Sequence, residues 1–180
     1  MEELFIKYIE LSNSLRPNYK ESIKKSGDDY LKLKDLPIPL KLIYSTVNGT
    51  PYEVKDQSLM DFIPGFLLTN VNEFNDFLFE FRKNYEEESY FPFLVNYSSD
   101  FYLLKVDEMN NDLGIYISTH DDIDIFKIHN SFEDFIKTSI AFYENDVYFL
   151  DNDGYLDMDF DRYMTIAQKM NPNIKYWFED

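Results

Sequence analysis

The stretch YFPFLVNYSSDFYLLKVD, Tyr90–Asp107, decides the fold class of this chain. Two runs rich in aromatic and branched apolar residues, YFPFLVNY and DFYLLKVD, are joined by the polar turn SSD, whose Asp100 also begins the second run. Apolar runs of this length around a short polar connection predict two antiparallel strands joined as a hairpin. GIYIST and IDIFKI follow as a second strand pair around the polar HDD. The middle of the chain is therefore predicted to be rich in β-structure.

Helical periodicity surrounds this region. VNEFNDFLFEFRKNY before it and SFEDFIKTSIAFYE after it carry apolar residues at helical spacing, and Ser131 is placed to cap the second helix. Earlier, LPIPLKLIYSTVNGTP predicts a proline-started helix that ends at Asn48-Gly49, where glycine supplies a left-handed stop. A helix-rich start followed by antiparallel hairpins with interposed helices is the α+β class. No glycine-rich phosphate loop joins a strand to a helix, which argues against Rossmann and P-loop folds.

The composition indicates a single folded domain over residues 1–180. Hydrophobic residues make up 44% of the chain and aromatic residues 18%, which excludes a disordered acidic tail. There is no cysteine, so disulfides and thiolate sites are excluded and a reducing compartment is compatible. The first residues begin acidic and never run apolar for long enough to form a signal peptide or a membrane span. We expect a soluble, cytoplasmic protein with no membrane partner.

The formal net charge of -17 is distributed unevenly along the chain. Residues 1–60 hold nine acidic and nine basic side chains, whereas residues 61–180 hold 25 acidic and eight basic ones. A field of this sign repels nucleic acids and anionic lipids, and it attracts basic proteins at long range. Solubility alone is the simpler interpretation of an acidic surface. The asymmetry favours a directional role, with a basic protein as partner.

The acidic stretch FLDNDGYLDMDFD, residues 149–161, resembles a calcium loop in part. With Gly154 at the sixth position of an EF-hand loop, Asp151 and Asp153 take the third and fifth. Phenylalanines then occupy the first and twelfth positions, where carboxylates are required. The flanks are strand-like, so we interpret DNDG as an acidic hairpin turn.

A second acidic segment, THDDIDI, combines His120 with nearby aspartates. The chain has only two histidines, which excludes a histidine-rich zinc site, and a solvated loop is the stronger interpretation. His129 precedes a helix and is predicted to pack or to cap. No G-x-S-x-G elbow or comparable nucleophile signature is present, and no cofactor, metal or catalytic residue is predicted. An enzyme whose residues converge only in three dimensions remains the less favoured alternative.

Several segments together resemble the SUKH superfamily, the α+β domain of fungal cell-wall assembly regulators and many bacterial immunity proteins. They are LPIPLKLIYSTVNGT, IPGFLLTNVNEF, the hairpin YFPFLVNYSSDFYLLKVD, GIYISTHDD and HNSFEDFIKTSIAFYE. The closing DRYMTIAQKMNPNIKYWFED is similar to the extension of some members, so the resemblance covers roughly residues 20–178. It departs from members with glycines in the central hairpin, where this chain has Ser98, Ser99 and Asp100. The resemblance implies a mixed, mostly antiparallel sheet flanked by helices, without catalysis, cofactor or metal.

The resemblance and the charge together favour an immunity protein that binds and neutralises a toxin domain, for example a nuclease. The alternative is an acidic cellular scaffold or regulatory binding module with an endogenous partner. Sheet-edge dimerisation is conceivable, and the sequence leaves the oligomeric state open. Three acidic loops are the predicted contact surface, although a solvated loop explains each position equally well. Their residues are Glu86, Glu87 and Glu88; Asp121, Asp122 and Asp124; and Asp151, Asp153 and Asp157.

Overall fold

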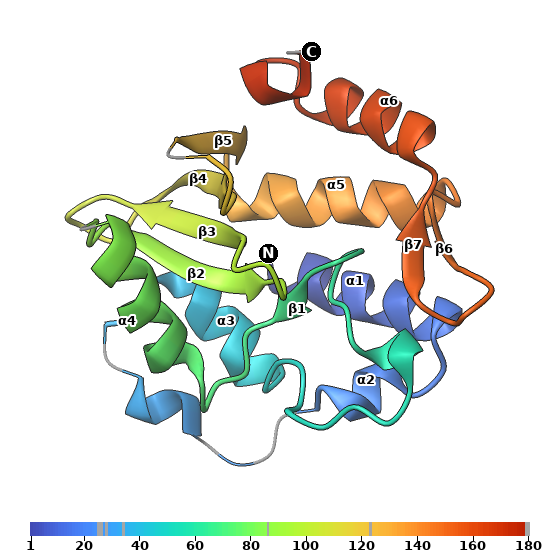
Figure 1. Cartoon of the computed structure of the whole chain (residues 1–180), viewed down its shortest axis with the longest axis horizontal. Helices are drawn as coiled ribbons and strands as arrows, with labels where there is room; N and C mark the ends of the chain where they lie inside the picture. The colour runs from blue at the N-terminus through green and yellow to red at the C-terminus, as the bar shows by residue number, and fades with distance from the viewer. Residues whose placement is uncertain (25–26, 28, 34, 86, 123, 179–180) are drawn as a thin grey trace.

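The computed structural model describes residues 1–24, 27, 29–33, 35–85, 87–122 and 124–178 (Figure 1). Five strands form one sheet in the order β1-β2-β3-β4-β5, and every neighbouring pair is antiparallel. The strands are β1 (Leu67–Leu68), β2 (Tyr90–Val95), β3 (Phe101–Val106), β4 (Asp112–Ser118) and β5 (Ile125–His129). The predicted hairpin is β2–β3, with Tyr90 opposite Lys105 and Val95 opposite Phe101. The α+β class is therefore confirmed, with an antiparallel sheet throughout its described strands.

Helices precede, interrupt and follow these strands. The α-helices are α1 (Glu2–Leu15), α2 (Tyr19–Ser22), α3 (Ile38–Thr46), α4 (Phe74–Tyr85), α5 (Phe132–Glu144) and α6 (Phe160–Met170). Short 3₁₀ turns are η1 (Asp29–Lys32), η2 (Gln57–Leu59) and η3 (Lys175–Phe178). β6 (Tyr148–Leu150) and β7 (Leu156–Met158) form a separate two-stranded hairpin around the acidic turn. Ser131 caps α5 as predicted, because its Oγ accepts a hydrogen bond from the Asp134 N–H at 3.0 Å.

The main sheet is buried on both faces, because successive residues of a strand point to opposite sides. On one face, Leu103 packs in a small cluster with Phe81 of α4. On the other face, Leu104 belongs to the large core that α1, α3 and α5 complete. Figure 1 shows α4 and α5 against different sides of the sheet. The near-continuous apolar sequence of the hairpin follows from this double burial.

Pro92 lies inside β2, which is a central strand, although proline cannot donate a hydrogen bond to the ladder. The register of β2 against β3 shifts between Pro92 and Leu94, which leaves Phe93 as an extra residue in a bulge. The ring of Phe93 packs edge-on against Phe132 and Phe135 of α5, at centroid distances of 5.9 and 5.6 Å. The bulge thus accommodates the proline and supplies an aromatic contact to the core.

Gly49 has a different role from the predicted one. Helix α3 ends at Thr46, and Val47 is already extended with φ -136° and ψ 162°, so glycine does not supply the helix stop. Gly49 has φ +90°, and a Cβ built on it would lie 2.3 Å from the backbone oxygen of Thr69. Its missing side chain allows the backbone to lie directly beside the segment that continues β1.

Both outer edges of the main sheet are covered near their centres. At β1, the Thr50 N–H donates to the Leu68 carbonyl at 2.9 Å, and the Leu68 N–H donates to Thr50 Oγ1 at 3.2 Å. At β5, the indole N–H of Trp177 donates to the Ile128 carbonyl at 2.7 Å. Covered edges disfavour pairing with a second sheet, so the structure does not favour dimerisation through the edges at Leu68 and Ile128.

The guanidinium of Arg16 is fully buried and joins four segments of the chain. It donates to the Asp61 carbonyl at 2.5 Å, to Ser12 Oγ at 2.6 Å and to the Tyr143 hydroxyl at 3.1 Å. Its carbon Cζ also lies 3.8 Å from the ring centroid of Tyr19. These contacts tie α1 to α2, to α5 and to the loop before β1, and they offset part of the cost of burying a charge.

We expect Gly49→Ala to destabilise the fold by about 3 kcal/mol, because it adds a backbone clash to the cost of a positive φ. Gly154→Ala is the matched control: its φ is +87°, and nothing lies within 4 Å of the added Cβ. That control should cost only about 1 kcal/mol. Urea unfolding followed by circular dichroism measures both values. Equal losses in the two variants would contradict the role assigned to the close approach at Thr69.

His129 predicts a pH-dependent stability. Its side chain is buried against Phe135 and Trp177, as the packing hypothesis expected, and its Nδ1–H donates to Asn171 Oδ1 at 2.8 Å. The Asn171 amide nitrogen donates to the Ala167 carbonyl, which leaves the amide oxygen to accept from the imidazole. Burial lowers the pKa of His129 from 6.5 to about 4.

The unfolded state therefore binds more protons than the folded state between about pH 6.5 and pH 4. The contribution of His129 to stability is complete above pH 6.5, and about 3 kcal/mol of it is lost as the pH falls to 4. His129→Gln should flatten the dependence of the urea midpoint on pH in this window, whereas His120→Gln should retain it. A wild-type slope in His129→Gln would refute the assignment.

Candidate functional site

The predicted acidic loops are exposed, but the structure does not gather them into one surface. Glu87 and Glu88 lie between α4 and β2, and their side chains are exposed. Glu86 lies outside the described residues. The Val106 N–H donates to the Ser89 carbonyl at 2.9 Å, which places this loop at the end of β3.

Asp121, Asp122 and Asp124 are exposed in the turn between β4 and β5. Their neighbour His120 binds Asp100, with Nδ1 2.8 Å from the carboxylate, and this hydrogen bond raises the pKa of His120. Asp100 immediately precedes β3, so this loop lies at the start of the same strand that ends near Glu88. The six residues of β3 separate the two loops by roughly 20 Å.

The third acidic loop is the β6–β7 hairpin. Asp151 has a structural role in it, because its carboxylate accepts the N–H groups of Asp153 and Tyr155 at 2.9 and 2.8 Å. Asp153 and Asp157 are exposed, and the Asp153 carbonyl accepts a hydrogen bond from Gln57 at 2.6 Å. This is the hairpin turn that the sequence predicts. Within the described residues, no group of three or more histidine, aspartate or glutamate side chains is arranged to hold a metal ion.

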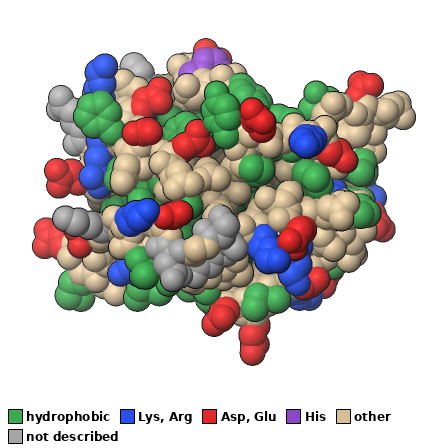
Figure 2. All heavy atoms as spheres, turned by 90° about the horizontal axis from the view of Figure 1, so that it is seen from below, with side chains coloured by type: hydrophobic (Ala, Val, Ile, Leu, Met, Phe, Trp, Pro, Cys, Tyr) green, Lys and Arg blue, Asp and Glu red, His purple; other side chains and the backbone are tan. Residues whose placement is uncertain are grey.

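The surface formed by the early part of the chain has a different character. Figure 2 shows the molecule from below, where acidic and basic side chains are interspersed over the early helices and connecting loops. This mixture agrees with the equal numbers of acids and bases in residues 1–60. Several ion pairs satisfy charges there, including Lys24 with Glu21 at 3.0 Å and Lys32 with Asp29 at 2.6 Å. Excess negative charge therefore belongs to the later elements.

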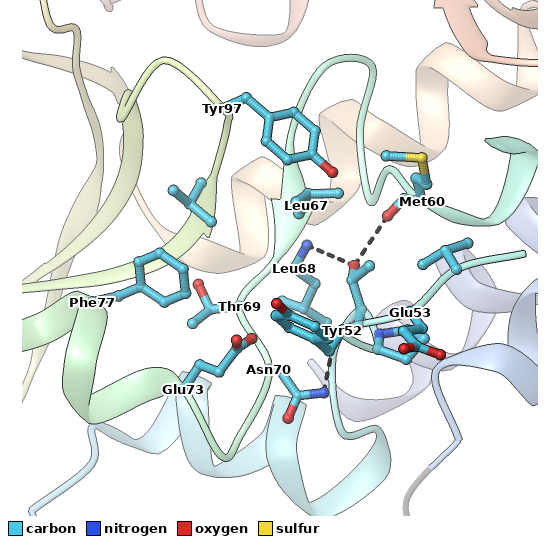
Figure 3. A pocket seen from close by; sticks show the side chains of 14 residues that line it. Tyr52, Glu53, Met60, Leu67, Leu68, Thr69, Asn70, Glu73, Phe77 and Tyr97 are labelled. Atoms are coloured by element: carbon cyan, nitrogen blue, oxygen red, sulfur yellow. Dashed lines mark hydrogen bonds between the residues drawn. The ribbon is translucent and has the colours of Figure 1, made fainter.

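A surface pocket of about 440 Å³ lies beside β1, between the loop that follows Gly49 and the start of α4. Figure 3 shows Tyr52 and Glu53 on one side, Phe77 and Glu73 on the other, and Tyr97 above β1. The wall includes apolar side chains from three strands or loops, Met60, Leu67 and Val95. Within the described residues, its lining contains two glutamates and no lysine or arginine. We call this site the β1 pocket.

Two aromatic side chains at the β1 pocket are almost fully exposed. Tyr52 is 89% exposed and Tyr97 is 83% exposed. Tyrosine is intermediate in its tendency to be buried, and it is enriched at binding surfaces because a rigid ring provides a large contact area. Side chains that are this exposed contribute little to the stability of the fold. The two rings are therefore candidates for contact with another molecule.

Thr50 and Thr69 line the same pocket, but only the hydroxyl of Thr50 forms hydrogen bonds within the described residues. Thr50 Oγ1 donates to the Met60 carbonyl at 3.0 Å and accepts from the Leu68 N–H. Thr69 is 1% exposed, yet its hydroxyl has no hydrogen-bond partner among the described residues. Its side chain projects beside Phe77, on the pocket side of the segment that continues β1 (Figure 3). A buried hydroxyl without a partner costs stability, and this one, unlike those of Tyr19 and Ser118, belongs to a residue that lines the pocket.

The sequence reasoning did not single out the residues of the β1 pocket. Tyr52, Glu73 and Tyr97 lie in three separate segments, and no local motif connects them. Only TPYE directly after Asn-Gly carries a weak signal, since it places an aromatic and an acidic side chain in one loop. The close approach at Gly49 brings this loop to β1 and thereby to Glu73 and Tyr97.

No protein-family model matches this chain, and no curated protein matches it significantly. Among the described residues, none of the helices combines the length and the apolar character needed to cross a bilayer.

We expect Thr69→Val to leave the free energy of unfolding unchanged or to raise it by up to about 1 kcal/mol, because it removes an unsatisfied hydroxyl. Thr50→Val is the matched substitution in the same pocket. It removes two hydrogen bonds and should cost about 2 kcal/mol. Urea unfolding of both variants tests the contrast. A clear loss of stability in Thr69→Val would show that its hydroxyl has a structural partner.

Proposed function

We propose that this protein is an immunity protein of the SUKH type, which binds a basic toxin domain in the cytoplasm and neutralises it without catalysis. The observation that carries the proposal is unpaired negative charge on exposed loops of the later elements. In the part of the chain that the structure describes, Glu87, Glu88, Asp122, Asp153 and Asp157 form no ion pair with a lysine or arginine. The order of segments that resembles the superfamily and the α+β fold support the same function.

The physical basis is complementarity of charge. A nuclease domain needs a basic surface to hold phosphates, and an acidic protein that covers this surface blocks access of the substrate. Complementary fields raise association rates to about 10⁸ M⁻¹s⁻¹ at low salt, because they steer the encounter over long distances. Exposed ion pairs contribute only about 0–1 kcal/mol each. Tight binding therefore requires at least one buried anchor in addition to the acidic loops.

The separation of the acidic loops limits what one partner contacts directly. Glu88 and Asp122 lie near opposite ends of β3, about 20 Å apart, and the β6–β7 hairpin contacts the loop around Gln57. A standard interface covers about 800 Å² of each protein, which does not require all three loops. We infer that one loop lies at the contact and the others act at long range.

Co-expression tests the function. When the neighbouring open reading frame is expressed and proves toxic, co-expression of this chain should restore survival, and the two proteins should co-purify. Co-purification without any effect on survival would instead support the scaffold or regulatory module. Turnover of a substrate by the purified chain would refute a purely binding role.

Three double variants locate the contact. Glu87→Gln/Glu88→Gln, Asp122→Asn/Asp124→Asn and Asp153→Asn/Asp157→Asn each remove two negative charges, so their effect on the overall field is matched. We expect one of these double variants to associate with the toxin domain about tenfold more slowly at low salt and with a weaker salt dependence. The other two should associate about twofold more slowly. Stopped-flow association over a salt series measures this. Three unchanged rates would exclude these loops from the contact.

A further inference from the structure

We propose that the β1 pocket binds the guanidinium side chain of an arginine displayed by the partner protein. This inference rests on the proposed function, because a basic toxin is the source of that arginine. It identifies an anchor, buried only when the partner binds, that the exposed acidic loops do not provide. The residues that carry it are Tyr52, Tyr97, Glu53, Glu73 and Thr69.

The first argument is charge. Glu53 and Glu73 are the charged residues of the lining, and no base neutralises them there. In the described residues, neither carboxylate forms an ion pair with a lysine, arginine or histidine. A planar guanidinium presents its N–H groups in a fork that matches a carboxylate, and such pairs are among the strongest hydrogen bonds in proteins.

The second argument is the aromatic surface. Tyr52 and Tyr97 present exposed rings on two sides of the pocket (Figure 3). Arginine stacks on aromatic faces, and this chain contains such a pair in its own core, where Arg16 lies 3.8 Å from the centroid of Tyr19. The methylene groups of the arginine would contact the apolar wall formed by Leu67 and Val95. The pocket therefore offers a place for the stem and for the charged end of one side chain.

The third argument is the hydroxyl of Thr69, which is independent of the acidic residues. It is buried and finds no partner in the part of the chain that the structure describes, and a hydroxyl oxygen accepts hydrogen bonds. Guanidinium has five N–H donors and one carboxylate accepts only part of them, so a second acceptor in the pocket adds to recognition. Binding of an arginine would satisfy the hydroxyl that folding leaves without a partner.

A separate protein is favoured as occupant over a second copy of this chain. Two copies each carry a net charge of -17 and repel one another. Strand addition at this edge is also disfavoured, because Thr50 occupies the backbone groups of Leu68. A basic side chain of another protein is attracted by the negative charge, and it needs no backbone hydrogen bonds from β1.

NMR titration of the full chain with the peptide Ac-Ala-Arg-Ala-NH₂ tests the inference. The peptide should shift the amide resonances of Leu68, Thr69 and Tyr97 in a saturable manner, with millimolar affinity because a single side chain binds. The same peptide with citrulline, the uncharged analogue of arginine, should bind about tenfold more weakly. Equal binding of the citrulline peptide, or no shifts up to about 20 mM peptide, would overturn the inference.

Matched variants separate the pocket from the overall charge. Glu73→Gln should weaken arginine binding by at least about fivefold, whereas Glu80→Gln, an exposed glutamate on α4 outside the pocket, should leave it within about twofold. Tyr52→Ala should also weaken binding while the urea midpoint stays unchanged. Equal effects of the two glutamate variants would show nonspecific attraction and overturn the site. A concentration-dependent dimer in sedimentation velocity that Tyr97→Ala abolishes would show that a second copy occupies the pocket, which also overturns it.

The outcomes distinguish this inference from the proposed function. If Glu73→Gln and Tyr52→Ala still neutralise the toxin and bind it with unchanged affinity, the pocket is not the anchor. The proposed immunity function would be unaffected by that result. Specific binding of the arginine peptide without neutralisation of any toxin would support the pocket and refute the immunity function.

Discussion

The close backbone contact between Gly49 and Thr69 is the constraint on which the site depends. Gly49 has no Cβ, which would otherwise lie 2.3 Å from the Thr69 carbonyl oxygen. The same carbonyl accepts a hydrogen bond from Tyr44 of α3 at 3.0 Å, so helix, loop and sheet meet at one peptide group. This contact lets Thr50 bond to Leu68 and cover the sheet edge. It also directs the following loop over β1, where Tyr52 becomes one side of a pocket instead of an isolated exposed residue.

The sheet provides a rigid frame for this contact because both of its faces are buried. Leu103 and Leu104 are neighbours in sequence, yet one packs with α4 and the other with the core around α5. Arg16 then joins the early helices to α5 and to the carbonyl of Asp61, through neutral acceptors and an aromatic ring. Burying a charge in this way is costly, and the hydrogen bonds of the two Nη groups offset part of that cost, whereas the buried Nε has no partner among the described residues. The Nη contacts hold the segments around Arg16 together. The β1 pocket therefore lies against a strand of this sheet, while Tyr52 and Tyr97 reach it from a loop and from the β2–β3 turn.

Charge and anchoring have separate locations in the proposed function. Exposed acidic loops act through a field that extends about 8–10 Å in physiological salt, so their exact positions matter little for attraction. An anchor needs defined geometry and exclusion of water, which exposed loop residues such as Asp121 and Asp122 do not provide. The β1 pocket combines apolar walls, two carboxylates and an unsatisfied hydroxyl at the β1 edge of the main sheet. The division resembles the general behaviour of protein interfaces, where rim charges set the association rate and a few buried groups set the lifetime.

Sequence alone determined the features that depend on local periodicity and on composition. The β2–β3 hairpin, the helix capped by Ser131, the acidic turn at Asp151–Gly154 and the excess charge of residues 61–180 follow from neighbouring residues. Tertiary structure alone decided the role of Gly49 and the separation of the acidic loops. It also decided the assembly of the pocket from Tyr52, Glu73 and Tyr97. Periodicity reports which face of an element is buried, but it contains no information on which distant segments share an edge. Long-range packing decides which segments lie side by side, and the pocket forms only when these segments come together.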